Sequence, residues 1–308
     1  MVEKCVKGKW RTFPTLVANG QVIVVRGSWI KTAALDDEDL SEREVENPQA
    51  CIERIQNQRH VVPADIFSFS QKLPLIAQRF NYPMELESIA VAHTANFENW
   101  WQGLPQESRK NVRRAQKRGV LIGLEEFNDE LIRGIQGVQN ETPIRQGKRY
   151  PHYGKTVEEV KRLHAVFADR SDFIVARCEG QFIGFLKLVY CGDVASIFQL
   201  NSMLAHYDKR PSNALVAKAV ELCSAKGIEY LKYGRFNYGN KSDSSLREFK
   251  IRNGFEEVLV PRYYVPLTPW GTLCVRFKLY RGLLGILPQS VILSILTVRR
   301  GWYHLRKL

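Results

Sequence analysis

Alternating apolar and polar positions predict several β-strands in the first part of the chain. Two apolar runs, Leu16–Ala18 and Val22–Val25, flank Asn19-Gly20, a dipeptide that favours a two-residue hairpin turn. A helix is predicted over Ala50–Gln58 and a short strand over residues 89–92. The first hundred residues are therefore expected to form a small unit with both strands and helix.

A basic helix is predicted over Glu107–Arg118, and Gly119 provides its C-terminal cap. Its Arg and Lys side chains form two stripes of like charge four residues apart, and each such pair disfavours a helix by about 0.2–0.5 kcal/mol. An anionic partner would relieve this repulsion, so Arg109 and Arg113 are candidates for substrate binding. The alternative is a solvated helix whose charges pair with nearby acids.

The second half of the chain has a more regular pattern. A helix is predicted over Thr156–Phe167. The apolar runs Phe173–Cys178 and Phe182–Tyr190 predict an antiparallel hairpin, and a third β-run follows over Ala195–Leu204.

The next segment predicts a parallel strand. Ser212–Lys226 is apolar around most of its circumference, which indicates a helix packed against a sheet. Ile228–Tyr233 follows as a strand, and a strand–helix–strand step of this length crosses over right-handed to a parallel neighbour.

Composition adds a strong charge bias. The net charge of +13 favours anionic partners. The six cysteines include no CxxC pair, so neither a zinc site nor a redox pair is predicted, and we expect free thiols in a reducing, cytoplasmic protein. Seven basic side chains and no acidic one lie in the last 43 residues: Arg276, Lys278, Arg281, Arg299, Arg300, Arg306 and Lys307.

These last residues also contain two apolar runs, Leu273–Leu287 and Val291–Val298, separated by Pro288. Each is shorter than the ~20 residues of a membrane span. Together with the basic residues they suit helices that lie in a membrane interface. We expect residues 273–308 to contact an anionic membrane, peripherally on its inner face; the alternative is packing on the protein's own core or in a dimer.

Four motifs occur in order along the chain. They are SRKNVRRAQKRGV at 108–120, TPIRQG at 142–147, RCEGQFIGF at 177–185, and LREFK at 246–250 followed by Gly254-Phe255. In order and spacing they resemble the Fem-type peptidoglycan aminoacyltransferases and their BioF2-like relatives, which are members of the GNAT superfamily of acyltransferases.

The resemblance implies a mixed α+β or α/β fold in three parts. A GNAT-type acyltransferase domain is expected over 101–268, a smaller divergent GNAT-like domain over 1–100, and a basic amphipathic helical tail over 269–308. The implied function is transfer of an acetyl, acyl or aminoacyl group to an amine, in cell-envelope or polysaccharide metabolism. Two alternatives are a non-catalytic nucleic-acid-binding protein and a membrane-associated scaffold on a degenerate GNAT core.

The implied donor is an acyl-CoA or an aminoacyl-tRNA. GNAT enzymes that use coenzyme A carry glycines between the third strand and the main helix, where backbone N–H groups reach the pyrophosphate. Residues 206–213 contain no glycine, which disfavours coenzyme A. Basic and capping residues before the helix still suit an anion, so four residues are donor-site candidates: Lys209, Arg210, Ser212 and Asn213.

GNAT-type transfer is a direct attack by the acceptor amine and needs a proton acceptor rather than a triad. Asp208 is the acid nearest the end of the third strand, and His206 and Tyr207 are candidates for a proton relay. No metal site is predicted.

Further substrate-binding candidates lie in the loop 140–155 and after the last parallel strand. The loop contributes Glu141, Thr142, Arg145 and Tyr153, and Arg145 is expected to fork onto a carboxylate or phosphate. Lys250 is a candidate because two neighbouring strands of the GNAT fold splay apart and the donor lies in the gap. Ordinary surface charges and salt bridges are the alternative for these residues.

Overall fold

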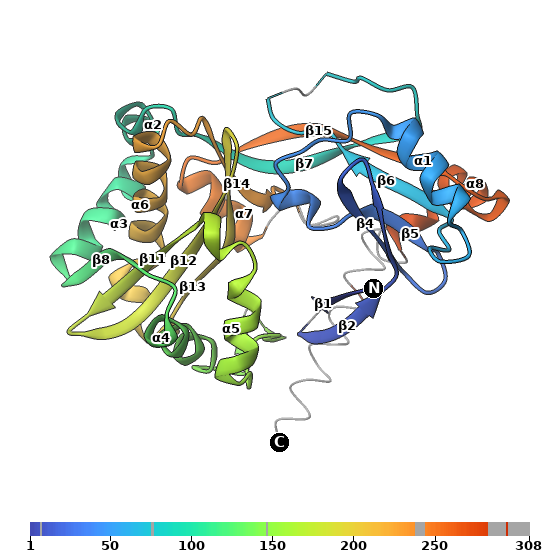
Figure 1. Ribbon diagram of the computed structural model, residues 1–308. Helices are drawn as coiled ribbons and strands as arrows, with labels where there is room; N and C mark the ends of the chain where they lie inside the picture. Colours follow the sequence, from blue (N-terminus) through green and yellow to red (C-terminus); the bar gives the residue numbers. More distant parts are fainter. Residues whose placement is uncertain (7, 75–76, 146, 238–243, 283–293, 295–308) are drawn as a thin grey trace.

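The computed structural model describes residues 1–6, 8–74, 77–145, 147–237, 244–282 and 294. A single sheet runs through both halves of the molecule (Figure 1). Its eleven strands lie in the order β3-β4-β5-β6-β15-β7-β14-β13-β12-β11-β8.

The same sequence of elements occurs twice in this sheet: two antiparallel strand pairs, then a helix, then a parallel strand. The first half contains β3 (Thr15–Ala18), β4 (Gln21–Arg26), β5 (Thr32–Leu35), α1 (Pro48–Asn57) and β6 (Ile66–Ser70). The second contains β11 (Ser171–Cys178), β12 (Gln181–Cys191), β13 (Val194–Ser202), α6 (Pro211–Ala225) and β14 (Tyr230–Arg235). The repeat confirms the prediction of a smaller GNAT-like unit ahead of a larger one.

The two halves exchange their final strands. β7 (Met84–His93) follows β6 along the chain but pairs with β14 of the second half. β15 (Glu256–Pro266) follows β14 but pairs with β6 of the first half, and β7 and β15 also pair with each other. The sheet therefore continues across residue 100, and the predicted boundaries at 100 and 268 stay predictions.

Helices cover both faces of the second half. α3 (Gln106–Lys117) and α6 pack on one face, over a core that includes Ile174, Leu186 and Leu231. α4 (Asp129–Gln139) and α5 (Val157–Ala165) pack on the other, over Phe173 and Phe185. α2 (Phe97–Gly103) precedes α3, and β8 (Val120–Glu125) forms the sheet edge.

Most predicted helices and strands agree with these elements to within a few residues at each end, but β7 begins well before the predicted strand over 89–92, and β6 was not predicted. Asn19 and Gly20 have φ values of 51° and 72°, the left-handed conformations that a type I′ hairpin turn requires. The shorter elements are β1 (Val2–Val6), β2 (Lys9–Phe13), η1 (Glu38–Leu40), β9 (Ile144–Arg145), β10 (Lys148–Arg149), η2 (Ala168–Arg170), η3 (Leu204–Lys209) and α7 (Ser245–Arg252).

The described part of the tail differs from the predicted helix over 273–287. The helix α8 (Pro269–Arg276) begins earlier and ends at Arg276, and η4 (Leu279–Arg281) follows. Lys278 has a φ of 55°, which breaks the helical path. The remainder of that run and the run over 291–298 fall outside the described residues, except Ser294. Within the described residues, no helix is both long and apolar enough to cross a bilayer.

Candidate functional site

The parallel strands β13 and β14 separate towards their C-terminal ends. They pair only from Val194 to Ser196 on β13, opposite Tyr230 to Lys232 on β14. β13 continues to Ser202, and no strand of the described chain pairs with that edge beyond Ser196. The separation leaves backbone groups free of sheet partners at the centre of the molecule.

A cavity of about 780 Å³ lies at this gap, and we call it the gap cavity. It reaches from β9 and β10 across β13 and η3 to α6 and α7. Its basic lining residues are Arg145, Lys148, Arg149 and Arg210, and none of the described lining residues is acidic. Three tyrosines, Tyr150, Tyr207 and Tyr233, also line it. The cavity therefore suits a ligand with negative charge.

The N-terminus of α6 opens into the gap cavity. Arg210 is its N-cap residue, has a left-handed conformation with φ of 60°, and makes no side-chain cap hydrogen bond. Ser212 and Asn213 of the first turn line the cavity. The positive end of the helix dipole thus adds to the basic side chains.

A chain of hydrogen bonds sets the direction in which Tyr150 donates. An arginine only donates, so the Asn201 atom bonded to Arg145 must be its amide oxygen, Oδ1. The amide nitrogen of Asn201 then donates to the Tyr150 hydroxyl oxygen over 2.7 Å. Gln199 donates to the same oxygen over 3.3 Å. The phenol oxygen accepts both of these hydrogen bonds with its lone pairs. Its own O–H is therefore directed to a ligand.

The phenol keeps that proton at neutral pH. Burial raises the pKa of Tyr150 to about 12. Its hydroxyl is therefore a neutral hydrogen-bond donor in a cavity whose charged lining residues, among those described, are all cationic. Such a group stabilises negative charge on an oxygen atom without itself carrying charge.

Arg145 lies at the wall of the cavity, but its guanidinium is bonded to the protein. One terminal nitrogen donates to Asn201 and to the Ser202 carbonyl, and the other donates to the Val138 carbonyl and to Glu141. The predicted fork onto a ligand would require these bonds to break. The structure instead gives Arg145 a positioning role, since it joins the end of α4 to the end of β13.

Glu141 has a similar role. Its carboxylate accepts from the backbone N–H groups of Leu204 and Ala205, at 2.7 and 2.9 Å, and pairs with Arg145. It therefore holds the start of η3, which forms one rim of the gap cavity. Thr142 makes a local turn, accepting from the N–H of Ile144 and donating to its carbonyl.

Several predicted residues do line the cavity. The structure brings together Arg145, Tyr207, Arg210, Ser212 and Asn213. Asn213 is also bonded to Asn253, which ties α6 to the end of α7.

The other catalytic candidates lie outside the lining. Asp208 forms an exposed ion pair with Arg118 at 2.7 Å, and His206 is not a lining residue. Lys209 turns away and donates to the Cys178 thiol at 3.3 Å. Asp208 was selected as a base because it lies near the end of the third strand in the sequence. Its carboxylate does not line the gap cavity.

The basic helix and Tyr153 also lie away from it. Arg109 donates to the carbonyls of Trp101 and Gln102, and Arg113 lies over the Trp101 ring at 5.7 Å from its centroid. Carbonyl oxygens and an aromatic face thus relieve part of the charge repulsion. Tyr153 is about half exposed on the loop surface.

Lys250 is fully buried rather than exposed at the strand end. Its ammonium donates to the Arg235 carbonyl at 2.6 Å and lies 4.7 Å from the Tyr233 ring centroid. Burial lowers the pKa of Lys250 to about 8. This lysine supports the end of β14 and is not among the cavity-lining residues.

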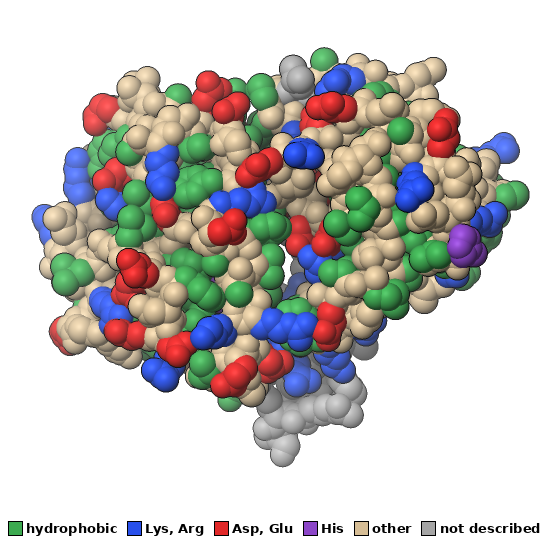
Figure 2. Space-filling model, in the orientation of Figure 1, with side chains coloured by type: hydrophobic (Ala, Val, Ile, Leu, Met, Phe, Trp, Pro, Cys, Tyr) green, Lys and Arg blue, Asp and Glu red, His purple; other side chains and the backbone are tan. Residues whose placement is uncertain are grey.

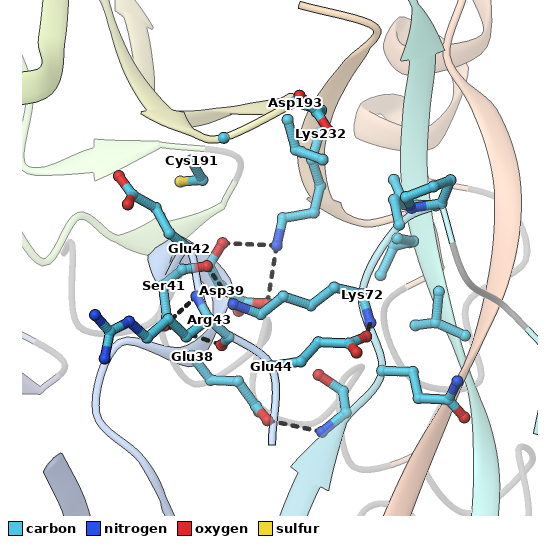
Figure 3. A pocket seen from close by; sticks show the side chains of 18 of the residues that line it. Glu38, Asp39, Ser41, Glu42, Arg43, Glu44, Lys72, Cys191, Asp193 and Lys232 are labelled. Carbon is cyan, nitrogen blue, oxygen red and sulfur yellow. Dashed lines mark hydrogen bonds and ion pairs between the residues drawn. The ribbon is translucent and has the colours of Figure 1, made fainter. Parts of the chain in front are cut away.

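A second cavity, of about 400 Å³, lies between the two halves (Figure 3). Charged side chains surround the hollow there (Figure 2). Seven of the residues that line it are acidic, and most have ionic partners: Asp39 pairs with Lys232, Glu42 with Arg170, and Glu38 with Arg262. These pairs link residues 38–42 to β14, to β15 and to Arg170 of η2, so we interpret this cavity as a joint rather than as the donor site.

Among the described residues, no cluster of His, Cys, Asp and Glu has the arrangement of a metal site. Four residues that line the gap cavity were not selected as site residues from the sequence: Tyr150, His152, Gln199 and Asn201. A sequence signal exists for two of them, because Gln199 and Asn201 are the large polar residues of a β-run whose other residues are apolar or serine. Tyr150 and His152 lie in the loop that was selected, yet its composition favoured Tyr153.

Solved structures with the same architecture are known. The chain is similar to FemX with a TM-score of 0.60 at 10% sequence identity, over 85% of this chain and 89% of that one. The chain has a tandem GNAT fold. The resemblance to Fem-type proteins is thereby confirmed at the level of the fold.

Two further solved structures are similar to the chain. The C-terminal domain of a putative lysylphosphatidylglycerol synthetase from Agrobacterium fabrum has a TM-score of 0.57 at 13% identity, over 87% of this chain and 88% of that one. L-PGS from Bacillus licheniformis has a TM-score of 0.55 at 14% identity, over 85% and 88%. No protein-family model matches the sequence, and a search of curated proteins finds no match either.

Proposed function

We propose that this protein transfers an acyl or aminoacyl group from an anionic donor to an amine, and that the donor binds in the gap cavity. The observation that carries this proposal is the basic cavity where β13 and β14 separate at the N-terminus of α6, whose described lining residues include no acid. The tandem GNAT fold is consistent with this reaction, but fold alone does not define a substrate, so the proposal rests on the cavity.

An aminoacyl-tRNA suits the site better than coenzyme A. The turn before α6 has no glycine, and Pro211 at the start of the helix has no backbone N–H to offer a pyrophosphate. The name of the putative lysylphosphatidylglycerol synthetase, whose C-terminal domain shares the fold, also refers to an aminoacyl group. We place the protein in the cytoplasm on the basis of its free thiols.

The chemistry follows from the residues that line the cavity. The amine nitrogen attacks the donor carbonyl carbon, and the carbonyl oxygen gains negative charge, to which Tyr150 donates its proton in a hydrogen bond. A C–N bond forms and the bond to the leaving oxygen or sulfur breaks. The nitrogen loses one proton and the leaving group gains one.

We propose His152 as the group that accepts the proton from the amine. It lines the gap cavity, and its ring lies 5.3 Å from that of Tyr150. Burial, followed by the charge of Lys155, lowers the pKa of His152. The imidazole is therefore neutral at pH 7 and available as a base.

The pH dependence of turnover tests this role. His152 must be unprotonated to act, so its contribution is complete above pH 6.5 and is lost as the pH falls through its lowered pKa. We expect the ratio of the wild-type rate to the His152→Gln rate to fall as the pH decreases through the lowered pKa of His152. Taking the ratio cancels the titration of the amine itself. A ratio that stays constant from neutral to acidic pH would show that His152 is not the base.

A donor-binding experiment tests the proposed function directly. Calorimetry is carried out with acetyl-CoA and with bulk aminoacyl-tRNA. We expect weak or no binding of acetyl-CoA, and tighter binding of charged than of uncharged tRNA. Low-micromolar affinity for acetyl-CoA would indicate an ordinary acetyltransferase. Equal affinity for both tRNA forms would favour the non-catalytic nucleic-acid-binding alternative.

Two double variants locate the donor. Arg149→Gln with Arg210→Gln removes two positive charges from the gap cavity, and Arg109→Gln with Arg113→Gln removes two from α3. We expect the first pair to weaken aminoacyl-tRNA binding by about tenfold or more, because each phosphate contact is ionic. Equal losses of aminoacyl-tRNA affinity in the two double variants would indicate that the basic helix α3 is also part of the donor site.

A further inference from the structure

An exposed aromatic surface lies at the opposite end of the molecule from β8 (Figure 1). It combines α8 with the turn between β4 and β5, two segments about 240 residues apart in the sequence. Trp29 in the turn is 66% exposed, and Leu273 and Phe277 of α8 are 43% and 59% exposed. Trp270 completes this surface, which we call the Trp surface.

The arrangement of α8 explains why these side chains face outwards. Gly271 and Cys274 face the protein, and a Cβ atom at Gly271 would lie 1.9 Å from the Asp65 carbonyl oxygen. The opposite positions 270, 273 and 277 are three and four residues apart and therefore form one stripe. The close backbone approach at Gly271 leaves this stripe on the outer side.

The turn and the helix are held together. Asp65 accepts from the backbone N–H of Lys31 at 2.9 Å with one carboxylate oxygen, and from the Thr268 hydroxyl at 3.1 Å with the other. The Trp270 indole donates to the Trp29 carbonyl at 3.3 Å, and the two rings have centroids 5.4 Å apart. The two tryptophans are thus presented as one rigid pair.

Charge decides what this surface fits. Arg276 and Lys278 lie beside the apolar stripe and are exposed, and the Lys278 ammonium lies 3.6 Å from the Glu85 carboxylate. No acidic residue occurs in the sequence after Glu257. The chain continues from Gly282 into residues 283–308, which add Arg299, Arg300 and further apolar residues. Scattered exposed apolar residues are normal, but paired indoles beside cations match the chemistry of an anionic membrane interface.

We propose that the Trp surface docks on an anionic lipid bilayer, with Trp29, Trp270 and Phe277 entering the interface and the basic side chains facing the headgroups. The contact is made by the folded body, in addition to the sequence beyond residue 282. It is independent of the proposed transfer reaction.

Vesicle sedimentation with the full chain tests this proposal. Vesicles of phosphatidylcholine alone are compared with vesicles that contain an equal amount of phosphatidylglycerol. We expect Trp29→Ala with Phe277→Ala to lower the partition coefficient on the anionic vesicles by tenfold or more. Leu121→Ala with Leu124→Ala is the matched control, because it removes two exposed apolar side chains from the edge strand β8, and binding should be unchanged.

A second measurement follows the indole itself. Quenching of tryptophan fluorescence by brominated lipid should decrease in Trp29→Phe relative to the wild type, because Trp29 enters the interface. Replacing Arg276 and Lys278 by Gln should weaken binding to anionic vesicles and leave the weak binding to phosphatidylcholine unchanged.

Three results would overturn the proposal. The full chain could ignore both kinds of vesicle at low salt. The Trp29/Phe277 double variant could bind as the wild type does, which would assign the contact to residues 283–308 alone. Finally, the wild type could self-associate without lipid in analytical ultracentrifugation while the double variant is monomeric, which would make the Trp surface a contact between copies of this chain.

Discussion

Tyr150→Phe is expected to lower kcat by about 100-fold with little change in KM, which is the range observed when one oxyanion donor is removed. The phenol proton is directed to the ligand because Asn201 and Gln199 both donate to its oxygen. The developing negative charge on the donor carbonyl exists only in the transition state, so the loss appears in kcat. Single-turnover transfer from bulk aminoacyl-tRNA to an amine measures it.

Two further variants separate this role from a packing role. Tyr153→Phe is the matched control, since Tyr153 lies outside the cavity lining and its variant should turn over at the wild-type rate. Asn201→Asp replaces the amide that donates to Tyr150 by a carboxylate oxygen that accepts. The tyrosine should then donate to residue 201, and the variant should lose activity as Tyr150→Phe does.

The double variant completes the cycle. In the Asn201→Asp variant the phenol already donates its proton to residue 201. Adding Tyr150→Phe should therefore not lower kcat further, and the two losses of kcat should not add. Additive losses would mean that the two side chains act separately. Wild-type kcat in Tyr150→Phe alone would remove the tyrosine from the mechanism while leaving the proposed transfer intact. An inactive wild type, by contrast, would contradict the proposed function itself.

The order of elements in the second half and the first hairpin of the first half could be predicted because they depend on local signals. Asn19-Gly20 defines one hairpin, and the apolar helix 212–226 between two strands requires a parallel crossover. These signals come from backbone conformation and from burial, which act within a few residues. They were sufficient to recognise a GNAT-type fold.

The exchange of final strands could not be predicted in the same way. Both β7 and β15 are strands with buried positions, and their patterns do not identify their neighbours. Pairing of β7 with β14 and of β15 with β6 depends on contacts between residues more than a hundred positions apart. The domain boundaries therefore came from motif positions rather than from packing.

Site residues were hard to predict for a related reason. The type of a residue indicates what it can bind, while its neighbours decide what it does bind. Arg145 was selected as a ligand fork, yet four protein acceptors surround it. Asp208 was selected by its place in the sequence, yet it pairs with Arg118 on the surface. Tyr150 gained its role only through two amides on a distant strand.

Arg145→Ala is expected to destabilise the fold by about 3–5 kcal/mol, the range found when one partner of a buried ion pair is removed. The Arg145 side chain is only 10% exposed and the Glu141 carboxylate 18%. The substitution would leave the Glu141 carboxylate without its cation and the carbonyls of Val138 and Ser202 without a donor. Urea denaturation followed by circular dichroism measures the change in the free energy of unfolding.

The comparison variants distinguish positioning from ligand binding. Arg145→Lys keeps the charge but cannot reach both sides of the joint between α4 and β13, so an intermediate loss is expected. Arg149→Ala, an exposed neighbour on β10, should change stability by no more than about 0.5 kcal/mol. If Arg145→Ala had the same midpoint urea concentration as the wild type and lost only donor binding, we would conclude that the guanidinium binds the ligand with two hydrogen bonds, as predicted from the sequence. Because Arg145 also orients Asn201 and through it Tyr150, any folded Arg145 variant should lose kcat together with stability.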